Sequence, residues 1–190
     1  QPVPGRGPAH REPVLTMANP FDLTGRKALV TGGATGIGEG IALALAAAGA
    51  DVALTYRSHQ PDETISKIES TGRKGVAVKA DFVGMDEATA AEVIDFATKE
   101  LGGLDILVNN AGISIDDSKN ALDVSWRTIE KTLQTNVVGP LLLCKNCIAL
   151  MKAGGYGRIV NMSSTLGSLS EIADPNSAYA GVGTPAYRLS

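Results

Sequence analysis

The sequence predicts an α/β fold in which a doubly wound parallel sheet forms a single domain. Two observations lead to this prediction. Short apolar, β-type runs alternate with helical segments along the chain, and the connections between them are short. The predicted strands are continuous apolar runs, as expected where helices cover both faces of a sheet. Such a sheet binds its ligand at the carboxyl ends of its strands, so polar residues there are the functional candidates.

The first half of the chain alternates strands with helices. Lys27–Thr31 and Asp51–Tyr56 are β-rich apolar runs that predict strands. Ile37–Ala48 is apolar and alanine-rich, and Gly49 follows it as a helix C-cap. Pro61–Thr71 predicts a polar helix, because a proline and two acidic residues open its first turn.

The pattern continues in the second half. Three more runs predict strands, namely Gly75–Ala80, Asp105–Val108 and Arg158–Met162. Three segments predict helices, namely Asp86–Leu101, Ser125–Gln134 and the strongly apolar Val137–Lys152. The stretch Gly167–Pro185 is rich in serine, glycine, alanine and proline, which predicts a loop or an insertion.

Composition excludes several classes of protein. The 190 residues are 44% hydrophobic and 19% charged with a net charge of -3, so the chain can bury a core. Lysine and arginine are scattered, which argues against nucleic acid as a partner. No apolar run approaches membrane-spanning length, and two cysteines make no disulfide framework. With no secretion signal in the sequence, we expect a cytoplasmic protein without a membrane partner.

The two ends of the chain differ from the rest. Residues 1–22 are expected to be a disordered or non-native leader, because the first 16 lack an apolar block and Met17 opens a sequence typical of a natural start. Residues 23–190 are expected to form the nucleotide-binding domain. Ser190 falls where a helix should be under way, so we expect the domain to be incomplete at its C-terminus.

A glycine cluster follows the first predicted strand. Three glycines at fixed offsets should occur by chance about 0.3 times in a chain with 22 glycines, so the motif depends on its strand-to-helix context. Gly32 permits the sharp turn, Gly36 lets the backbone approach a pyrophosphate, and Gly38 allows close helix packing. The N–H groups at the helix start, around Thr35 and Ile37, would face the phosphates. The alternative is a tight turn without a ligand.

The glycine spacing T-G-x-x-x-G-x-G, followed by Asn109-Asn110-Ala111-Gly112 after a strand, resembles the short-chain dehydrogenase/reductase family. The resemblance extends from about Leu23 to Ser190. It implies a Rossmann-type fold and an oxidoreductase that uses a nicotinamide cofactor. It also places Asn109, Ala111 and Gly112 against the adenosine half of that cofactor.

Three further residues match the catalytic pattern of the family: Asn136, Ser164 and Tyr187. The resemblance implies that Tyr187 exchanges a proton with a carbonyl or alcohol oxygen, Ser164 hydrogen-bonds that oxygen, and Asn136 holds a water of a proton relay. The bland alternatives are a helix cap for the asparagine and a turn former for the serine. The family lysine expected four residues after Tyr187 would be residue 191, so we expect this polypeptide to be inactive.

Tyr179 competes with Tyr187 for the catalytic role. Tyr179 lies 15 residues after Ser164, nearer the usual family spacing than the 23 residues of Tyr187. However, Ala-Gly-Val-Gly follows Tyr179 and forms a poor helix, whereas Tyr187 follows Pro185, a good first-turn residue. We therefore expect Tyr187 to be the catalytic tyrosine.

The residues at the end of the second predicted strand indicate which cofactor is preferred. An acidic residue there would bind the ribose hydroxyls of NAD, but this chain has Arg57 and Ser58, which could contact a 2′-phosphate. We expect NADP(H) to be preferred, with NAD(H) possible; the alternative is that Arg57 is only a solvated loop residue. Asp81 matches the family's adenine-contacting aspartate, or else is a turn residue that leads a helix.

No metal site is expected. Cys144 and Cys147 form a C-x-x-C pair in mid-helix, where we expect them to pack as small apolar residues rather than to act in redox chemistry. His10 and His59 are isolated and offer no cluster of ligands.

The resemblance leaves the substrate open. The tail Gly167–Tyr187 resembles carbonyl-reductase-type members, whereas Ser58–Thr64 resembles sugar-acid and polyol dehydrogenases. A small carbonyl compound or alcohol is the expected substrate, and the family implies a homo-oligomer for the full-length protein. Two alternatives to an enzyme are a nucleotide-binding module without chemistry and a non-functional truncated product.

Overall fold

A computed structural model describes residues 19–116, 120–179 and 181–190. Most of the expected leader, and His10 with it, lies outside the described residues. The last four residues of that segment, 19–22, form a turn in which the Asp22 N–H donates to the Asn19 carbonyl at 3.0 Å. The next residue, Leu23, is tied to the segment after α1, because its N–H donates to the Ala48 carbonyl at 2.8 Å.

Five parallel strands form the sheet, in the order β3-β2-β1-β4-β5. The strands are β1 (Lys27–Val30), β2 (Asp51–Tyr56), β3 (Gly75–Lys79), β4 (Ile106–Asn109) and β5 (Arg158–Asn161). The order runs outward from β1 to β3 and then restarts on the other side with β4. The predicted doubly wound parallel sheet is therefore confirmed, and its switch point lies between β1 and β4.

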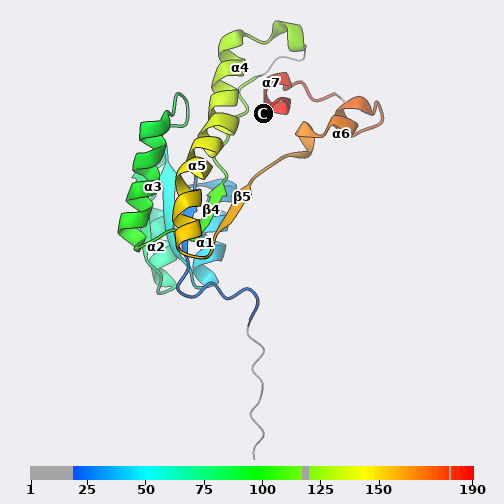
Figure 1. Cartoon of the computed structure of the whole chain (residues 1–190). Helices are drawn as coiled ribbons and strands as arrows, with labels where there is room; N and C mark the ends of the chain where they lie inside the picture. Colours follow the sequence, from blue (N-terminus) through cyan, green and yellow to red (C-terminus); the bar gives the residue numbers. More distant parts are fainter. Residues whose placement is uncertain (1–18, 117–119, 180) are drawn as a thin grey trace, which may run out of the picture.

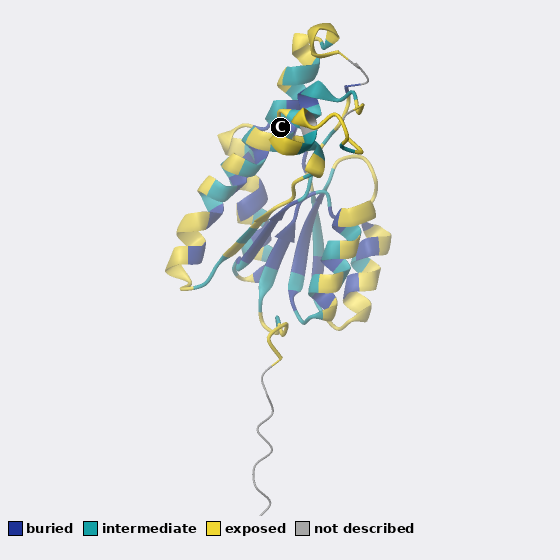
Figure 2. Cartoon of the chain, turned by 90° about the vertical axis from the view of Figure 1, so that its right-hand side faces the viewer, coloured by how far each residue is buried: buried dark blue, intermediate teal, exposed yellow. Residues whose placement is uncertain are grey.

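Helices cover both faces of the sheet (Figure 1). On one face lie α1 (Gly36–Ala47) and α2 (Asp62–Ser70), and on the other lie α3 (Glu87–Leu101) and α5 (Gly139–Ala153). Neighbouring residues of one strand point to opposite faces, so Val30 packs with α1 while Leu29 packs with α3 and α5. The central strands are accordingly the most buried part of the molecule (Figure 2).

The two helices predicted around residue 135 are one continuous helix. α4 (Trp126–Leu133) passes into the π-helical segment η2 (Gln134–Val138), which continues as α5. The prediction of two separate helices was wrong. Pro140 lacks an N–H and would clash with the carbonyl four residues before it in a regular α-helix, but a wider π turn accommodates the proline without ending the helix. The wider turn closes with the Gly139 N–H donating to the Gln134 carbonyl.

The combined helix Trp126–Ala153 has 28 residues and is, by length and composition, long and apolar enough to cross a membrane. The prediction that no apolar run approaches that length was therefore wrong, because the two predicted helices are continuous. One helix of this kind is weak support for a membrane protein, because core helices pass the same test. Here α5 buries Leu143, Cys147 and Met151 against α3 and the sheet.

The predicted loop Gly167–Pro185 contains a helix, so that part of the prediction was wrong. α6 (Leu169–Ala173) lies between the 3₁₀ turn η3 (Thr165–Gly167) and the short helix α7 (Pro185–Arg188). Ser168 caps α6 by accepting a hydrogen bond from the Glu171 N–H at 3.4 Å. The S-x-x-E spacing of these two residues is a helix-start signal that the composition of the stretch concealed. A further 3₁₀ turn, η1 (Ala121–Asp123), precedes α4.

β5 forms one edge of the sheet. Val160 and Met162, at and just after the end of this strand, are each 45% exposed, whereas the strands at the centre of the sheet are buried. The fifth strand is thus an apolar edge, and such edges favour aggregation.

Candidate functional site

The glycine loop joins β1 to α1 at the switch point of the sheet. Gly32 and Gly36 have positive φ values of 64° and 58°, which an L-residue rarely adopts. A Cβ on Gly38 would lie 2.2 Å from the Gly32 carbonyl oxygen, so helix and loop approach more closely than any side chain permits. Each glycine therefore has a backbone reason for its place in the motif.

The start of α1 is open to an anion. Thr35 takes the extended backbone of an N-cap, yet its side chain accepts no hydrogen bond from the helix. The first N–H groups of a helix have no partner within the helix, and their partial positive charge favours phosphate. Glu39, the acid in the first turn, pairs with Lys67 at 2.9 Å. Hydrogen bonds to Glu63 and Glu39 raise the pKa of Lys67 to about 12, so this cation persists and offsets the acid.

The Asn109–Gly112 turn is tied to the glycine loop. The Thr31 hydroxyl accepts hydrogen bonds from the N–H groups of Asn110 and Ala111, both at 2.9 Å. The Asn110 amide in turn donates to the Thr31 carbonyl at 2.9 Å. Asn110 was not singled out from the sequence, although it is the second residue of the same motif, and it is the side chain that joins the two loops.

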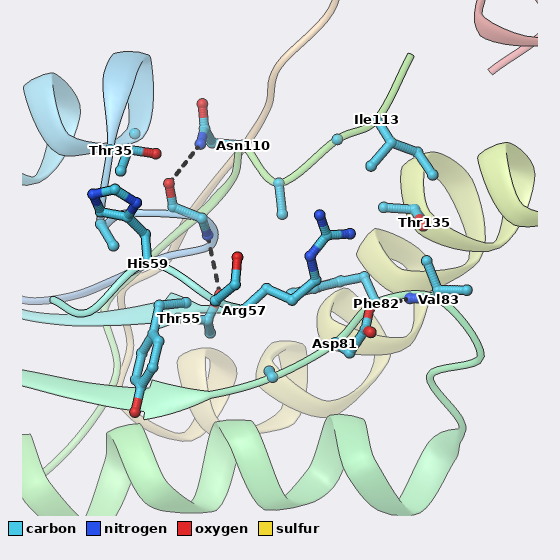
Figure 3. Close-up of a pocket in the computed structure, with 18 of the residues that line it drawn as sticks. Thr35, Thr55, Arg57, His59, Asp81, Phe82, Val83, Asn110, Ile113 and Thr135 are labelled. Atoms are coloured by element: carbon cyan, nitrogen blue, oxygen red, sulfur yellow. Dashed lines mark hydrogen bonds between the residues drawn. The ribbon is translucent and has the colours of Figure 1, made fainter. Parts of the chain in front are cut away.

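A cavity of about 390 Å³ lies at the carboxyl ends of β1, β2 and β3 (Figure 3). Nine of the predicted cofactor residues line it: Gly32, Thr35, Ile37, Gly38, Arg57, Ser58, Asp81, Ala111 and Gly112. The Arg57 guanidinium points into the middle of this cavity, and His59 lies on the side of the glycine loop. The cavity has the size of a ligand pocket.

Two predicted cofactor residues do not line this cavity. Gly36 lies in the glycine loop with open space where a Cβ would be. Asn109 is buried at the end of β4, where its amide donates to the Asn161 side chain at 2.8 Å and to the Cys144 sulfur at 3.4 Å. Its contacts join β4 to β5 and α5, so in this structure its side chain supports the sheet.

A second cavity of about 590 Å³ collects the three predicted catalytic residues from distant parts of the chain. Asn136 comes from the π-helical segment, Ser164 follows β5, and Tyr187 lies on α7. Tyr179 is not among the residues that line it. The two cavities share four lining residues, namely Ile37, Asn110, Ala111 and Gly112, so they form neighbouring parts of one cleft.

Hydrogen bonds fix two of these side chains. The Asn136 side-chain oxygen, Oδ1, accepts a hydrogen bond from the Ile113 N–H at 2.8 Å. Its side-chain nitrogen, Nδ2, donates to the Ile113 carbonyl at 2.9 Å and to the Ser190 hydroxyl at 2.8 Å. The Ser164 oxygen accepts from the Leu166 N–H at 3.2 Å, which leaves its own hydroxyl hydrogen for another acceptor.

The cysteines of the C-x-x-C pair pack in or against the hydrophobic core. Cys147 is fully buried in the core beside α3, and its burial, followed by the neighbouring Cys144, raises its thiol pKa to about 11. Such a thiol is a poor nucleophile at neutral pH. No group of metal ligands occurs among the residues that the structure describes.

Comparison with known protein families identifies the family of this chain. Residues 26–181, more than half of the chain, match the model of the short-chain dehydrogenases. The chain belongs to the short-chain dehydrogenase family. Tyr187 lies beyond the matched range, so its assignment depends on the geometry above.

Relatives of known sequence and structure agree with the family. General stress protein 39 of Bacillus subtilis is 38% identical over 75% of this chain and 49% of its own length. The 2-dehydro-3-deoxy-D-gluconate 5-dehydrogenase of Dickeya dadantii is 32% identical over 90% of the chain and 62% of its own length. A short-chain dehydrogenase from Burkholderia cenocepacia, solved with NADP, has a TM-score of 0.69 and 35% identity over 86% of this chain and 64% of its own. The chain thus spans about half to two thirds of the length of these relatives.

Proposed function

We propose that this short-chain dehydrogenase interconverts a carbonyl compound and an alcohol with NADP(H) as its preferred cofactor. The observation that carries the proposal is the joined cleft. One part is lined by the glycine loop and Arg57, and the adjoining part is lined by Asn136, Ser164 and Tyr187. A cleft at the switch point of a doubly wound sheet is where such folds bind dinucleotides.

The residues present fit a dinucleotide phosphate. A Cβ at Gly36 would meet nothing within 4 Å, so a pyrophosphate can approach the uncapped start of α1 there. Arg57 offers a charge-assisted hydrogen bond to a 2′-phosphate, and no acid stands at the end of β2 to hold ribose hydroxyls instead. The Burkholderia relative solved with NADP supports the same preference.

In the proposed reaction, the nicotinamide supplies or accepts the hydride when it is bound. Tyr187 protonates the carbonyl oxygen during reduction, and the Ser164 hydroxyl donates a hydrogen bond that holds this oxygen beside the phenol. Asn136 fixes the cavity wall through Ile113 and holds a water that returns a proton to the site. A cation near the tyrosine would favour its phenolate form.

A second candidate is a nucleotide-binding module without chemistry. One observation favours it: the family match covers residues 26–181, which include the glycine loop but not Tyr187. Both candidates predict cofactor binding, and only the first predicts turnover.

The test separates binding from turnover. NADPH binding is measured by fluorescence titration on the 190-residue chain and on the same chain extended by a helical segment that begins with lysine at position 191. Reduction of a panel of carbonyl compounds is followed by NADPH absorbance. We expect both chains to bind NADPH and only the extended one to turn over appreciably.

The tyrosine assignment has its own control. In the extended chain, Tyr187→Phe should abolish turnover while NADPH still binds, and Tyr179→Phe should leave turnover nearly unchanged. Loss of activity in Tyr179→Phe alone would reverse the assignment, and absence of NADPH binding in every form would reject the proposed function.

A further inference from the structure

Asp116 is a buried carboxylate outside both cavities. It lies in the segment after β4 and is 6% exposed. Its Oδ2 accepts hydrogen bonds from the N–H groups of Ala186 at 2.6 Å and of Tyr187 at 3.4 Å, 70 residues further along the chain. Its Oδ1 has no hydrogen-bond partner among the described residues. Burial of a carboxylate is unfavourable unless it is hydrogen-bonded, so a carboxylate kept at this position indicates that its two hydrogen bonds have a structural role.

The reason lies in the helix that Asp116 contacts. α7 has four residues, too few for a helix to be stable in isolation. Its N-cap, Thr184, makes no side-chain cap, and Pro185 has no N–H. The N–H groups of Ala186 and Tyr187 are therefore the first free donors of α7, and Asp116 accepts from both. A negative charge at this end also favours the helix dipole.

The other end of α7 is held independently. The Ser190 hydroxyl donates to the Tyr187 carbonyl at 2.8 Å and accepts from the Asn136 amide at 2.8 Å. The helix that carries Tyr187 is thus fixed at one end from the segment after β4 and at the other end from the π-helical segment. Neither anchor touches the phenol, so both act on its backbone.

We propose that Asp116 is a positioning residue that holds the backbone of α7 and thereby directs Tyr187 into the cavity lined by Ser164. This inference rests on the proposed function for its catalytic meaning. Without Asp116, the two N–H groups lose their acceptor, α7 opens, and Tyr187 leaves the cavity that it lines together with Ser164.

Hydrogen exchange of the Ala186 and Tyr187 amides tests the proposal directly on the 190-residue chain. A hydrogen bond to a charged group contributes enough for its loss to speed exchange about tenfold, so Asp116→Ala should show that increase. Asp116→Asn keeps a neutral acceptor of the same shape and should show a smaller increase, about threefold. Asp123→Ala removes an exposed acid from the neighbouring turn η1 and should leave exchange unchanged.

A second readout reports the side chain. The chain has four tyrosines, so 3-fluorotyrosine labelling gives four fluorine signals that Tyr→Phe variants assign. We expect the signal of Tyr187 to move in Asp116→Ala, and to return towards its place in Asp116→Asn. Tyr179 can respond as well, because Arg188 of α7 donates a hydrogen bond to its carbonyl. Tyr56, which lines the nucleotide cavity, should not respond.

The proposal is overturned if exchange at both amides in Asp116→Asn and Asp116→Ala equals that in Asp123→Ala. Should Asp116→Ala not fold, as judged by circular dichroism, the comparison of Asp116→Asn with Asp123→Ala decides alone. These measurements need no turnover, so they can fail while the proposed function holds. If instead the proposed function fails and this proposal holds, Asp116 still protects the amides of α7 from exchange although no carbonyl compound is reduced.

Discussion

Two glycines of α1 should respond oppositely to the same substitution. Gly38 and Gly40 lie two residues apart, and an added methyl group at either would raise helix propensity by about 1 kcal/mol. At Gly40 the new Cβ meets nothing within 4 Å. At Gly38 it would lie 2.2 Å from the Gly32 carbonyl oxygen and 2.5 Å from the Asn110 amide nitrogen. The two variants thus share the gain in helix propensity, and only Gly38→Ala introduces a steric clash.

The size of the clash follows from which atoms must move. Overpacking typically costs about 1–3 kcal/mol and sometimes more. The upper part of that range applies at Gly38, because one clashing atom is backbone and the other, the Asn110 amide, is held by its bond to the Thr31 carbonyl. Against a gain of about 1 kcal/mol, Gly38→Ala should lower the free energy of unfolding by about 1–2 kcal/mol, whereas Gly40→Ala should raise it by about 0.5–1 kcal/mol.

Urea unfolding followed by far-ultraviolet circular dichroism measures both variants. With a slope near 2 kcal/mol per molar urea, the midpoint should fall by about 0.5–1 M in Gly38→Ala and rise by about 0.3–0.5 M in Gly40→Ala. NADPH affinity should fall in Gly38→Ala alone, because the loop that it displaces lines the nucleotide cavity. Equal stability of the two variants, or unchanged NADPH affinity in Gly38→Ala, would refute this account of the glycine motif.

Three other perturbations follow from the structure. Arg57→Asp should weaken NADPH binding tens-fold and leave NADH binding nearly unchanged, as fluorescence titration would detect; an equal loss for both cofactors, or no loss compared with Arg73→Asp, would demote Arg57 to a surface residue. The pKa of Cys147 is raised from 9.0 to about 11, so the stabilisation from its buried neutral thiol is complete below pH 9 and is lost as the pH rises towards 11. Unfolding curves of Cys147→Ala should therefore depend less on pH in that window, and the same slope in both proteins would exclude the thiol. Val160→Lys places a charge on the exposed edge strand and should reduce aggregation measured by light scattering, whereas the same change at the buried Val30 should unfold the chain; unchanged scattering in Val160→Lys would show that the edge does not drive association.

The sheet could be predicted from the sequence because its signals are local. Each strand is an apolar run closed by glycine or a polar turn, and the strand Asp51–Tyr56 has the predicted bounds. The other strands differ by one residue at one or both ends, which reflects where hydrogen bonding ends. The glycine loop was equally readable, because positive φ at Gly32 and Gly36 and the close approach at Gly38 are properties of those residues themselves.

Two features of the fold could not be read in this way. The π-helical segment depends on how a helix accommodates Pro140, and no propensity scale contains that register shift. The helix Leu169–Ala173 was hidden by its polar, flexible composition, although its capping serine was present in the sequence. In the site, Asn110 was missed because its contacts with Thr31 bridge 79 residues.

The two halves of the cleft differ in how they are built. The core of the nucleotide part is formed by two short loops, after β1 and β4, whose shape is fixed by glycines and by Thr31. These loops follow strands that are buried except at Lys27. The part with Tyr187 depends on a four-residue helix that is held by side chains from distant segments, Asp116 and Asn136. Local opening requires the loss of few contacts there, whereas opening of the glycine loop requires disruption of the core. Cofactor binding should therefore survive mild denaturant that already abolishes protection of the Tyr187 amide.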